Sequence, residues 1–144
     1  MDAQQTLVDR LATVPLFARC HRADLRVIAK YCEVRDVPAD TVLVRSGELT
    51  SDFFVLLSGS ARRGGPAPPI YDLGPGDYFG ELAILDPAPR SLDVMATSDA
   101  TVGVLTRSAF LLVLDAVTGV APQLLQALAH RLRTADLGEN EPGH

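Results

Sequence analysis

The sequence predicts a mainly β fold with flanking helices, an eight-stranded antiparallel jelly-roll β-barrel. Helical periodicity is confined to the two ends of the chain, and the middle contains eight short runs rich in β-branched and aromatic residues. The runs start near residues 33, 41, 52, 60, 70, 78, 92 and 100. Most of these starts are 8 to 11 residues apart, as expected for an antiparallel sandwich or jelly roll.

Length and composition favour one domain. The chain has 144 residues, 47% of them hydrophobic and 22% charged, and this composition excludes a chain that is disordered or a coiled coil over its whole length. We therefore expect a single domain over 1–144. Its parts are N-terminal helices (1–32), the β-barrel (33–106), C-terminal helices (107–136) and a flexible tail (137–144).

The first third of the chain predicts two helices. Each shows apolar residues at helical spacing, and the turn VPLF at 14–17 separates the two patterns. The apolar positions are Leu7, Val8 and Leu11 in the first helix, and Leu25, Ile28, Ala29 and Cys32 in the second.

The barrel segment is interrupted once. The strand runs are EVRDV, TVLVR, DFFVLL, SAR, IYDL, DYF, LDVMAT and ATVGVL, with GGPAPP at 64–69 as a hairpin loop. The interval from 78 to 92 is too long for one turn, and it contains the helix formers Glu81, Leu82 and Ala83 directly after Gly80. A short helix is expected there.

Two more helices follow the last strand. Thr106 or Ser108 can cap the first, which Gly119 ends, and Pro122 suits the first turn of the second. The apolar stripe of the last helix either docks on its own domain or forms a homodimer contact. The stripes consist of Phe110, Leu111, Leu114 and Val117, and of Leu124, Leu125, Leu128, Ala129 and Leu132.

Charge and hydropathy exclude several classes of protein. A net charge of −5 does not favour nucleic-acid binding. The longest apolar runs, Phe53–Leu57 and Ala109–Leu114, are far shorter than the roughly 20 residues of a membrane span. The first residues lack a signal pattern, so a cytoplasmic location is expected. Cys20 and Cys32 are expected to be reduced.

The interrupted interval has the chemistry of an anion site. Because Gly80 precedes a short helix, the free N–H groups of Leu82 and Ala83 would favour an anion. Arg90 offers a planar fork of donors that matches phosphate oxygens, and Ser91 adds a hydroxyl. Together these groups suit one phosphate.

Glu81 distinguishes a nucleotide from inorganic phosphate. Its carboxylate would repel a bare anion, but it can accept a hydrogen bond from a ribose hydroxyl. The simpler interpretations are that Gly80 is a turn residue and that Glu81 forms a salt bridge with Arg90. The combination of these residues in the one irregular interval favours a nucleotide site.

The segment Gly74–Leu85, GPGDYFGELAIL, followed by Pro89-Arg90-Ser91, resembles the phosphate-binding cassette of cyclic nucleotide-binding domains. These domains occur in catabolite activator proteins, regulatory subunits of protein kinase A and cyclic-nucleotide-gated channels. The segments VPADTVLVRSGE (37–48) and FFVLLSGSAR resemble the same family. The resemblance implies that the Leu82 and Ala83 backbone, Arg90 and Ser91 hold the cyclic phosphate. Glu81 and Gly80 would take the ribose 2′-OH.

The resemblance is weaker at the last helix, which in this family carries the residue that caps the purine. Alignment with catabolite activators places Ala135 and Asp136 where a pair of hydroxyl residues touches adenine, and Thr134 lies one position earlier. Arg131 or Arg133 could stack on the base instead, or could lie on a solvated helix face. Leu92, larger than the usual alanine, would narrow the pocket. Phe79 completes the set of candidate ligand contacts, next to Gly80.

The choice between cAMP and cGMP stays open on residue grounds, because a hydroxyl at Ser91 suits either purine. Thirteen basic residues include only one lysine, Lys30, which is typical of a bacterial genome rich in GC. Since cAMP is the commoner messenger there, cAMP is the expected ligand.

The expected function is a stand-alone sensor domain that signals in trans, through its C-terminal helices, to a protein effector. The alternative is an interaction module that keeps the fold and binds no nucleotide. Catalytic residues, metal ligands and cofactors are not expected. The three histidines, at 21, 130 and 144, lie outside the predicted strands and do not suit a cupin-type metal site. A DNA-binding regulator needs a helix-turn-helix after the last helix, where eight residues remain.

Overall fold

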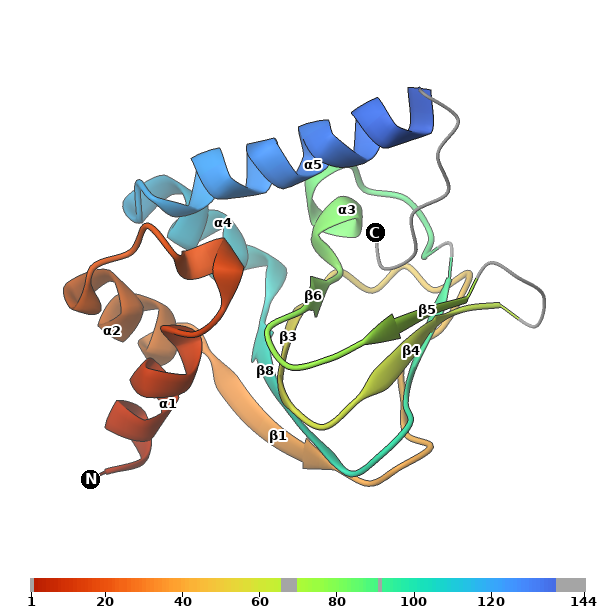
Figure 1. The fold of residues 1–144 in the computed structure, drawn as a ribbon, viewed down its shortest axis with the longest axis horizontal. Helices are drawn as coiled ribbons and strands as arrows, with labels where there is room; N and C mark the ends of the chain where they lie inside the picture. Colours follow the sequence, from red (N-terminus) through yellow and green to blue (C-terminus); the bar gives the residue numbers. More distant parts are fainter. Residues whose placement is uncertain (1, 66–69, 91, 137–144) are drawn as a thin grey trace.

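Two four-stranded antiparallel sheets, with helices at one end, make up the computed structural model, which describes residues 2–65, 70–90 and 92–136 (Figure 1). The helical elements are α1 (Ala3–Leu11), η1 (Pro15–Phe17), α2 (Arg22–Tyr31), α3 (Glu81–Leu85), α4 (Arg107–Ala116) and α5 (Val120–Asp136). The strands are β1 (Glu33–Val37), β2 (Val42–Val44), β3 (Phe53–Ser58), β4 (Ala61–Gly64), β5 (Ile70–Leu73), β6 (Tyr78–Phe79), β7 (Asp93–Ala96) and β8 (Ala100–Leu105).

The sheets correct one detail of the expected fold. The strand orders are β1-β8-β3-β6 and β2-β7-β4-β5, and the strands of the described segments form no ladder between the two sheets. The domain is therefore a two-sheet structure and not the closed eight-stranded barrel that the strand spacing suggested. Edge strand β6 has two residues and β2 has three, with a register shift between Val42 and Val44. Each of these two strands pairs with one neighbour, β6 with β3 and β2 with β7.

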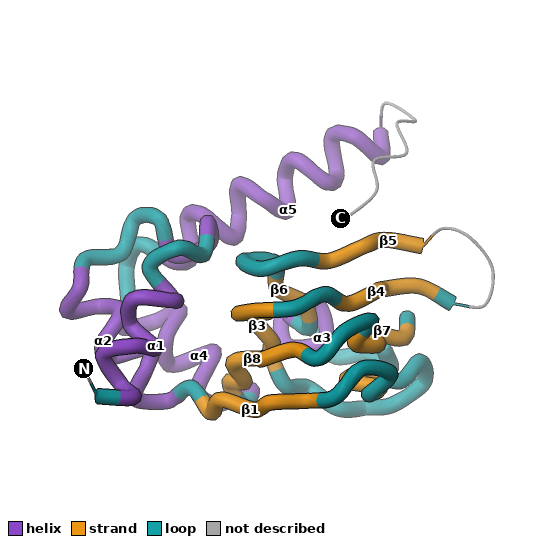
Figure 2. The backbone as a smooth tube through the Cα atoms, turned by 60° about the horizontal axis from the view of Figure 1, so that its bottom comes forward, coloured by secondary structure: helices purple, strands orange, loops and turns teal. Residues whose placement is uncertain are grey.

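The helices gather at one end of the two sheets. Figures 1 and 2 show α1, α2 and α4 at that end, and α5 leaving it to run past α3. Asp2 caps α1 by accepting a hydrogen bond from the Gln5 N–H at 2.7 Å. Of the two candidate caps for α4, Thr106 is the one used, because its hydroxyl accepts from the Ala109 N–H at 3.2 Å.

Strand β3 of the first sheet is buried on both faces, because it alternates between two hydrophobic cores. Phe53 and Val55 face the helices, and the ring of Phe53 stacks on that of Phe110 with centroids 4.3 Å apart. Phe54 and Leu56 face the second sheet. This arrangement explains why β3 is a continuous apolar run.

Helix α5 is anchored at its start. Val120 and Leu124 are buried in the helical core, and the side-chain amide of Gln123 donates to the carbonyl of Pro15 at 3.2 Å. Across the described part of the chain, no single helix is long and apolar enough to span a membrane. Taken together, α4 and α5 pass that test, but the pair bends by 107° at its break.

Both cysteines are free thiols, as expected. Burial raises the pKa of Cys32 to about 11, and it raises the pKa of Cys20 as well. Neither thiol is therefore activated as a nucleophile.

Candidate functional site

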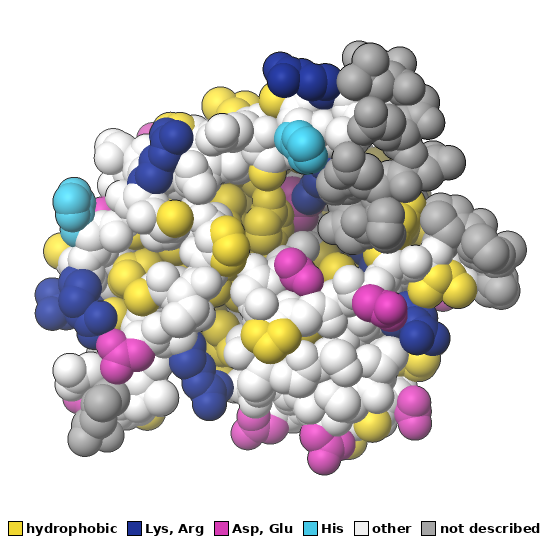
Figure 3. Space-filling view, in the orientation of Figure 1, with side chains coloured by type: hydrophobic (Ala, Val, Ile, Leu, Met, Phe, Trp, Pro, Cys, Tyr) yellow, Lys and Arg dark blue, Asp and Glu magenta, His cyan; other side chains and the backbone are white. Residues whose placement is uncertain are grey.

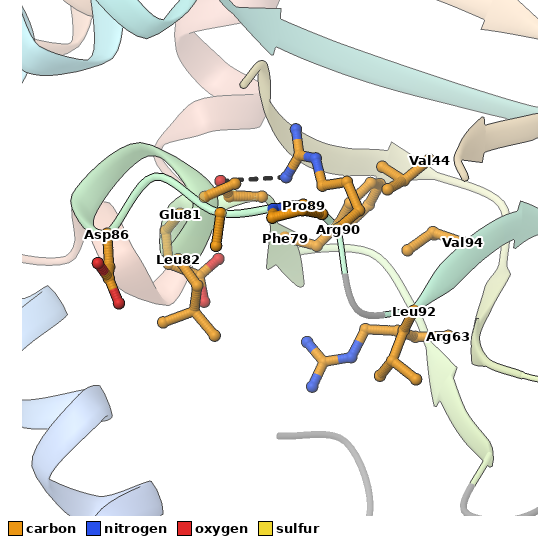
Figure 4. Close-up of a pocket in the computed structure, with 13 residues that line it drawn as sticks. Val44, Arg63, Phe79, Glu81, Leu82, Asp86, Pro89, Arg90, Leu92 and Val94 are labelled. Atoms are coloured by element: carbon orange, nitrogen blue, oxygen red, sulfur yellow. Dashed lines mark hydrogen bonds between the residues drawn. The ribbon is translucent and has the colours of Figure 1, made fainter. Parts of the chain in front are cut away.

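A cavity of about 320 Å³ lies where β6 leads into α3. Its walls are Phe79–Ala83, the following loop up to Arg90, and side chains from three strands of the second sheet, including Val44, Arg63 and Val94 (Figure 4). In the space-filling view, hydrophobic side chains line the hollow below α5, with acidic and basic side chains beside them (Figure 3).

Gly80 sets the start of α3. Its φ is +98°, in the left-handed region where glycine is favoured. A Cβ at this position would overlap the carbonyl oxygen of Asp52 and would lie 3.2 Å from Nη1 of Arg90. Gly80 is thus more than a turn residue, because it lets the chain closely approach Asp52, directly before β3, and Arg90.

Arg90 is 7% exposed, and three hydrogen bonds fix its guanidinium. Nη2 donates to the Asp52 carbonyl at 2.9 Å, Nη1 to the Gly80 carbonyl at 3.3 Å, and Nε to the Thr50 hydroxyl at 3.2 Å. Burial lowers the pKa of Arg90, and the carboxylates of Asp52 and other nearby acids oppose that effect. The arginine is therefore held beside the Gly80 turn.

Glu81 is the most buried charged residue in the described chain, with 1% of its surface exposed. Its Oε1 pairs with Nη1 of Arg131 at 2.9 Å. Its Oε2 is buried, and no hydrogen-bond donor reaches it from the residues that the structure describes. An unsatisfied carboxylate oxygen beside a cavity is costly unless a ligand supplies the donor.

The simpler interpretation of Glu81 and Arg90 as partners in a salt bridge is wrong. Glu81 pairs with Arg131, whose side chain is 20% exposed, and Arg90 binds the oxygens of Thr50, Asp52 and Gly80 instead. The alternative that Arg131 lies on a solvated helix face is therefore wrong. Its ion pair with Glu81 connects α5 to α3.

Two neighbours complete the Arg131 environment. The Thr134 hydroxyl donates to the carbonyl of Arg131 at 2.9 Å, and Thr134 is buried. Burial raises the pKa of Tyr78, with the charge of Glu81 acting in the same direction and that of Arg131 opposing it. The Thr134 hydroxyl thus donates its hydrogen bond within α5.

The remaining candidates have different positions. Phe79, Leu82, Ala83 and Leu92 all line the cavity, and Leu82 is half-exposed. Ser91 lies outside the described residues. The cavity thus brings together Phe79, Gly80, Glu81, Leu82, Ala83, Arg90 and Leu92, and Arg131 joins them through Glu81.

Arg63 is the site residue that sequence reasoning missed. It enters the cavity wall from β4, its guanidinium carbon lies 5.5 Å from the ring centre of Tyr71, and burial lowers its pKa. Strand alternation could have found it. Ala61 of β4 faces the core, so the residue two positions later lies on the same inward face.

The site has the features of a ligand-binding cavity. Within residues 2–65, 70–90 and 92–136, no group of three or more histidine, cysteine or acidic residues could hold a metal ion. What the cavity offers is a fixed arginine, a buried acceptor and apolar walls. These groups suit a small ligand with an anionic end, a hydroxyl and an apolar body.

Comparison with known proteins gives a consistent answer. The family model described as "Cyclic nucleotide-binding domain" matches residues 34–116. The chain is 36% identical over 119 residues to a cAMP-dependent protein kinase regulatory subunit of Mycosarcoma maydis, covering 76% of this chain and 23% of that protein. It is 31% identical over 128 residues to the cyclic AMP receptor protein of Thermus thermophilus, covering 85% and 59%.

A solved structure of PKAR with Sp-2Cl-cAMPS bound superposes with a TM-score of 0.81, covering 96% of this chain and 93% of that one. At 23% identity this likeness shows the fold. The chain spans less than two thirds of the length of both curated relatives.

Proposed function

Because the chain belongs to the cyclic nucleotide-binding domain family, we propose that the cavity at α3 binds a cyclic nucleotide and makes this domain a sensor. The observation that carries the proposal is the buried Glu81 carboxylate, whose Oε2 faces no donor from the described residues. A ribose 2′-OH would supply the missing hydrogen bond.

The geometry and the family support the following contacts. Arg90 and the backbone of Leu82 and Ala83, which line the cavity, would hold the cyclic phosphate. The family resemblance adds the hydroxyl of Ser91, which lies outside the described residues. Glu81 and Gly80 would hold the ribose. The apolar walls, including Phe79 and Leu92, would enclose the rest of the ligand.

We take cAMP as the ligand, with cGMP as the competing candidate. The names of the two curated relatives, a cAMP-dependent kinase regulatory subunit and a cyclic AMP receptor protein, support this choice. The signal would pass to a separate protein through α5, because α5 carries Arg131 and so contacts the ligand-binding carboxylate directly. Binding shifts the position of α5 only if the nucleotide has different affinities for its two arrangements.

Titration calorimetry with cAMP, cGMP and 5′-AMP tests the proposal. We expect a cyclic nucleotide to bind the wild-type domain and 5′-AMP, which lacks the cyclic phosphate, to bind much more weakly. Glu81→Ala should weaken cyclic nucleotide binding. If no cyclic nucleotide binds at millimolar concentration, the proposal is wrong and the alternative of a nucleotide-independent interaction module is favoured.

A further inference from the structure

The cavity contains one cation that the proposed contacts leave unused. Arg63 lies in the wall on β4, and its Nε is buried without a hydrogen-bond partner from the part of the chain that the structure describes. Figure 4 shows its guanidinium pointing to a different side of the site from that of Arg90. A buried donor of this kind is costly unless a ligand atom accepts its hydrogen bond.

The proposed phosphate contacts do not need Arg63, because Arg90 already supplies a cation beside the Gly80 turn. Arg131 and Glu81 form an ion pair with each other, and Arg90 lies beside the Gly80 turn, where the single negative charge of a cyclic phosphate would bind. The charged groups that act on Arg63 are Arg131, which lowers its pKa, and Glu81, which opposes that effect. Arg63 is thus free for the uncharged part of the ligand.

The chemistry of the guanidinium selects among bases. Its polar atoms are all donors, and the Tyr71 ring covers one side of it at 5.5 Å. The exposed edge of guanine presents two adjacent acceptors, O6 and N7, and this edge pairs with arginine bidentately. Adenine presents N7 beside an amino group, which is itself a donor.

We propose that Arg63 is a specificity-determining residue, which donates to the O6/N7 edge of guanine and so raises the affinity for cGMP relative to cAMP. This inference rests on the proposed function. It concerns the ratio of the two affinities, so it holds whichever nucleotide binds more tightly overall.

The test compares Arg63→Met with a matched control, Arg62→Met. Both substitutions remove an arginine from β4, but Arg62 pairs with Asp72 on the surface at 3.3 Å and its side chain is 52% exposed. Arg63→Lys keeps the charge and loses the planar fork. If Arg63→Met does not fold, Arg63→Lys takes its place in the comparison.

The ligands are cAMP, cGMP and cIMP, measured by calorimetry on each variant. Hypoxanthine in cIMP has the same O6/N7 edge as guanine but lacks the 2-amino group. Arg63→Met should weaken cGMP and cIMP binding by about 5- to 150-fold relative to cAMP, the range expected for one bidentate pair. Arg63→Lys should give a smaller loss for the same two ligands, and Arg62→Met should change none of the three.

Three results would overturn the inference. An equal loss for all three ligands would assign Arg63 to the phosphate or to the fold. A loss for cGMP without one for cIMP would place recognition at the 2-amino group, and unchanged ratios would remove Arg63 from base recognition. Failure of the wild-type domain to bind any of the three is a different outcome, because it contradicts the proposed function itself.

Discussion

The carboxylate of Glu81 and the guanidinium of Arg131 lie 2.9 Å apart and join α3 to α5. The carboxylate side chain is 2% exposed and the guanidinium side chain 20%, so the pair is screened from water much more than a surface salt bridge. The residue that would hold the ribose is therefore also the residue that holds the last helix.

A double-mutant cycle should show this coupling. Glu81→Gln and Arg131→Met each leave one buried charge without its partner, so each should destabilise the domain. We expect the double variant to be more stable than the sum of the single effects implies, by about 1–3 kcal/mol. Urea unfolding of the four proteins measures the coupling, and additive single effects would exclude it.

Arg90→Ala should weaken cAMP binding. A charged hydrogen-bonded group contributes about 1.5–3 kcal/mol, which corresponds to a loss of about 10- to 150-fold in affinity. Calorimetry on both proteins measures the change. Arg107→Ala is the control, because Arg107 is exposed at the start of α4 and should leave the affinity unchanged. If Arg90→Ala and wild type have equal affinities, Arg90 does not contribute to cAMP binding.

Gly80→Ala should destabilise the domain more than Gly47→Ala. Both glycines have positive φ, +98° and +88°, so both variants lose about 1–2 kcal/mol through backbone strain. A Cβ at Gly47 meets nothing within 4 Å, whereas one at Gly80 meets the Asp52 carbonyl. Thermal unfolding should therefore show an additional loss of about 1–3 kcal/mol for Gly80→Ala. Equal losses would mean that the turn relaxes.

Cys32 should make stability fall in alkaline solution. Because burial raises the pKa of its thiol from an ordinary 9.0 to about 11, the native state retains a proton that the unfolded state releases. The stabilisation is therefore complete below pH 9 and is lost as the pH rises towards 11. Urea unfolding of wild type and Cys32→Ala across this range should show a converging difference in stability. A constant difference would contradict the raised pKa.

The sequence allowed most of the local structure to be predicted. The run DFFVLL was expected as a strand and forms β3, and the interval after Tyr78 was expected to hold a short helix and forms α3. Alternation, apolar runs and a glycine before helix formers are local signals, so they can be recognised without tertiary contacts.

The long-range relationships could not be predicted in the same way. Neither the pairing of Glu81 with Arg131 nor the entry of Arg63 into the cavity has a local signal, because each depends on where α5 and β4 lie in the fold. The expected barrel closure failed for a related reason. The number of strands was right, but closure requires the edge strands of the two sheets to pair, and that pairing depends on long-range placement rather than on a local signal.

Helix α5 is attached at its two ends by forces of different kinds. Apolar burial of Val120 and Leu124 holds its first turns, and the Arg131 ion pair holds its far part. Mobile ions screen a largely buried ion pair only weakly and leave apolar contacts intact or strengthen them. Added salt alone should therefore leave α5 in place, whereas loss of the Glu81–Arg131 contact would release the far part of α5 from α3 while the core of the domain stays folded.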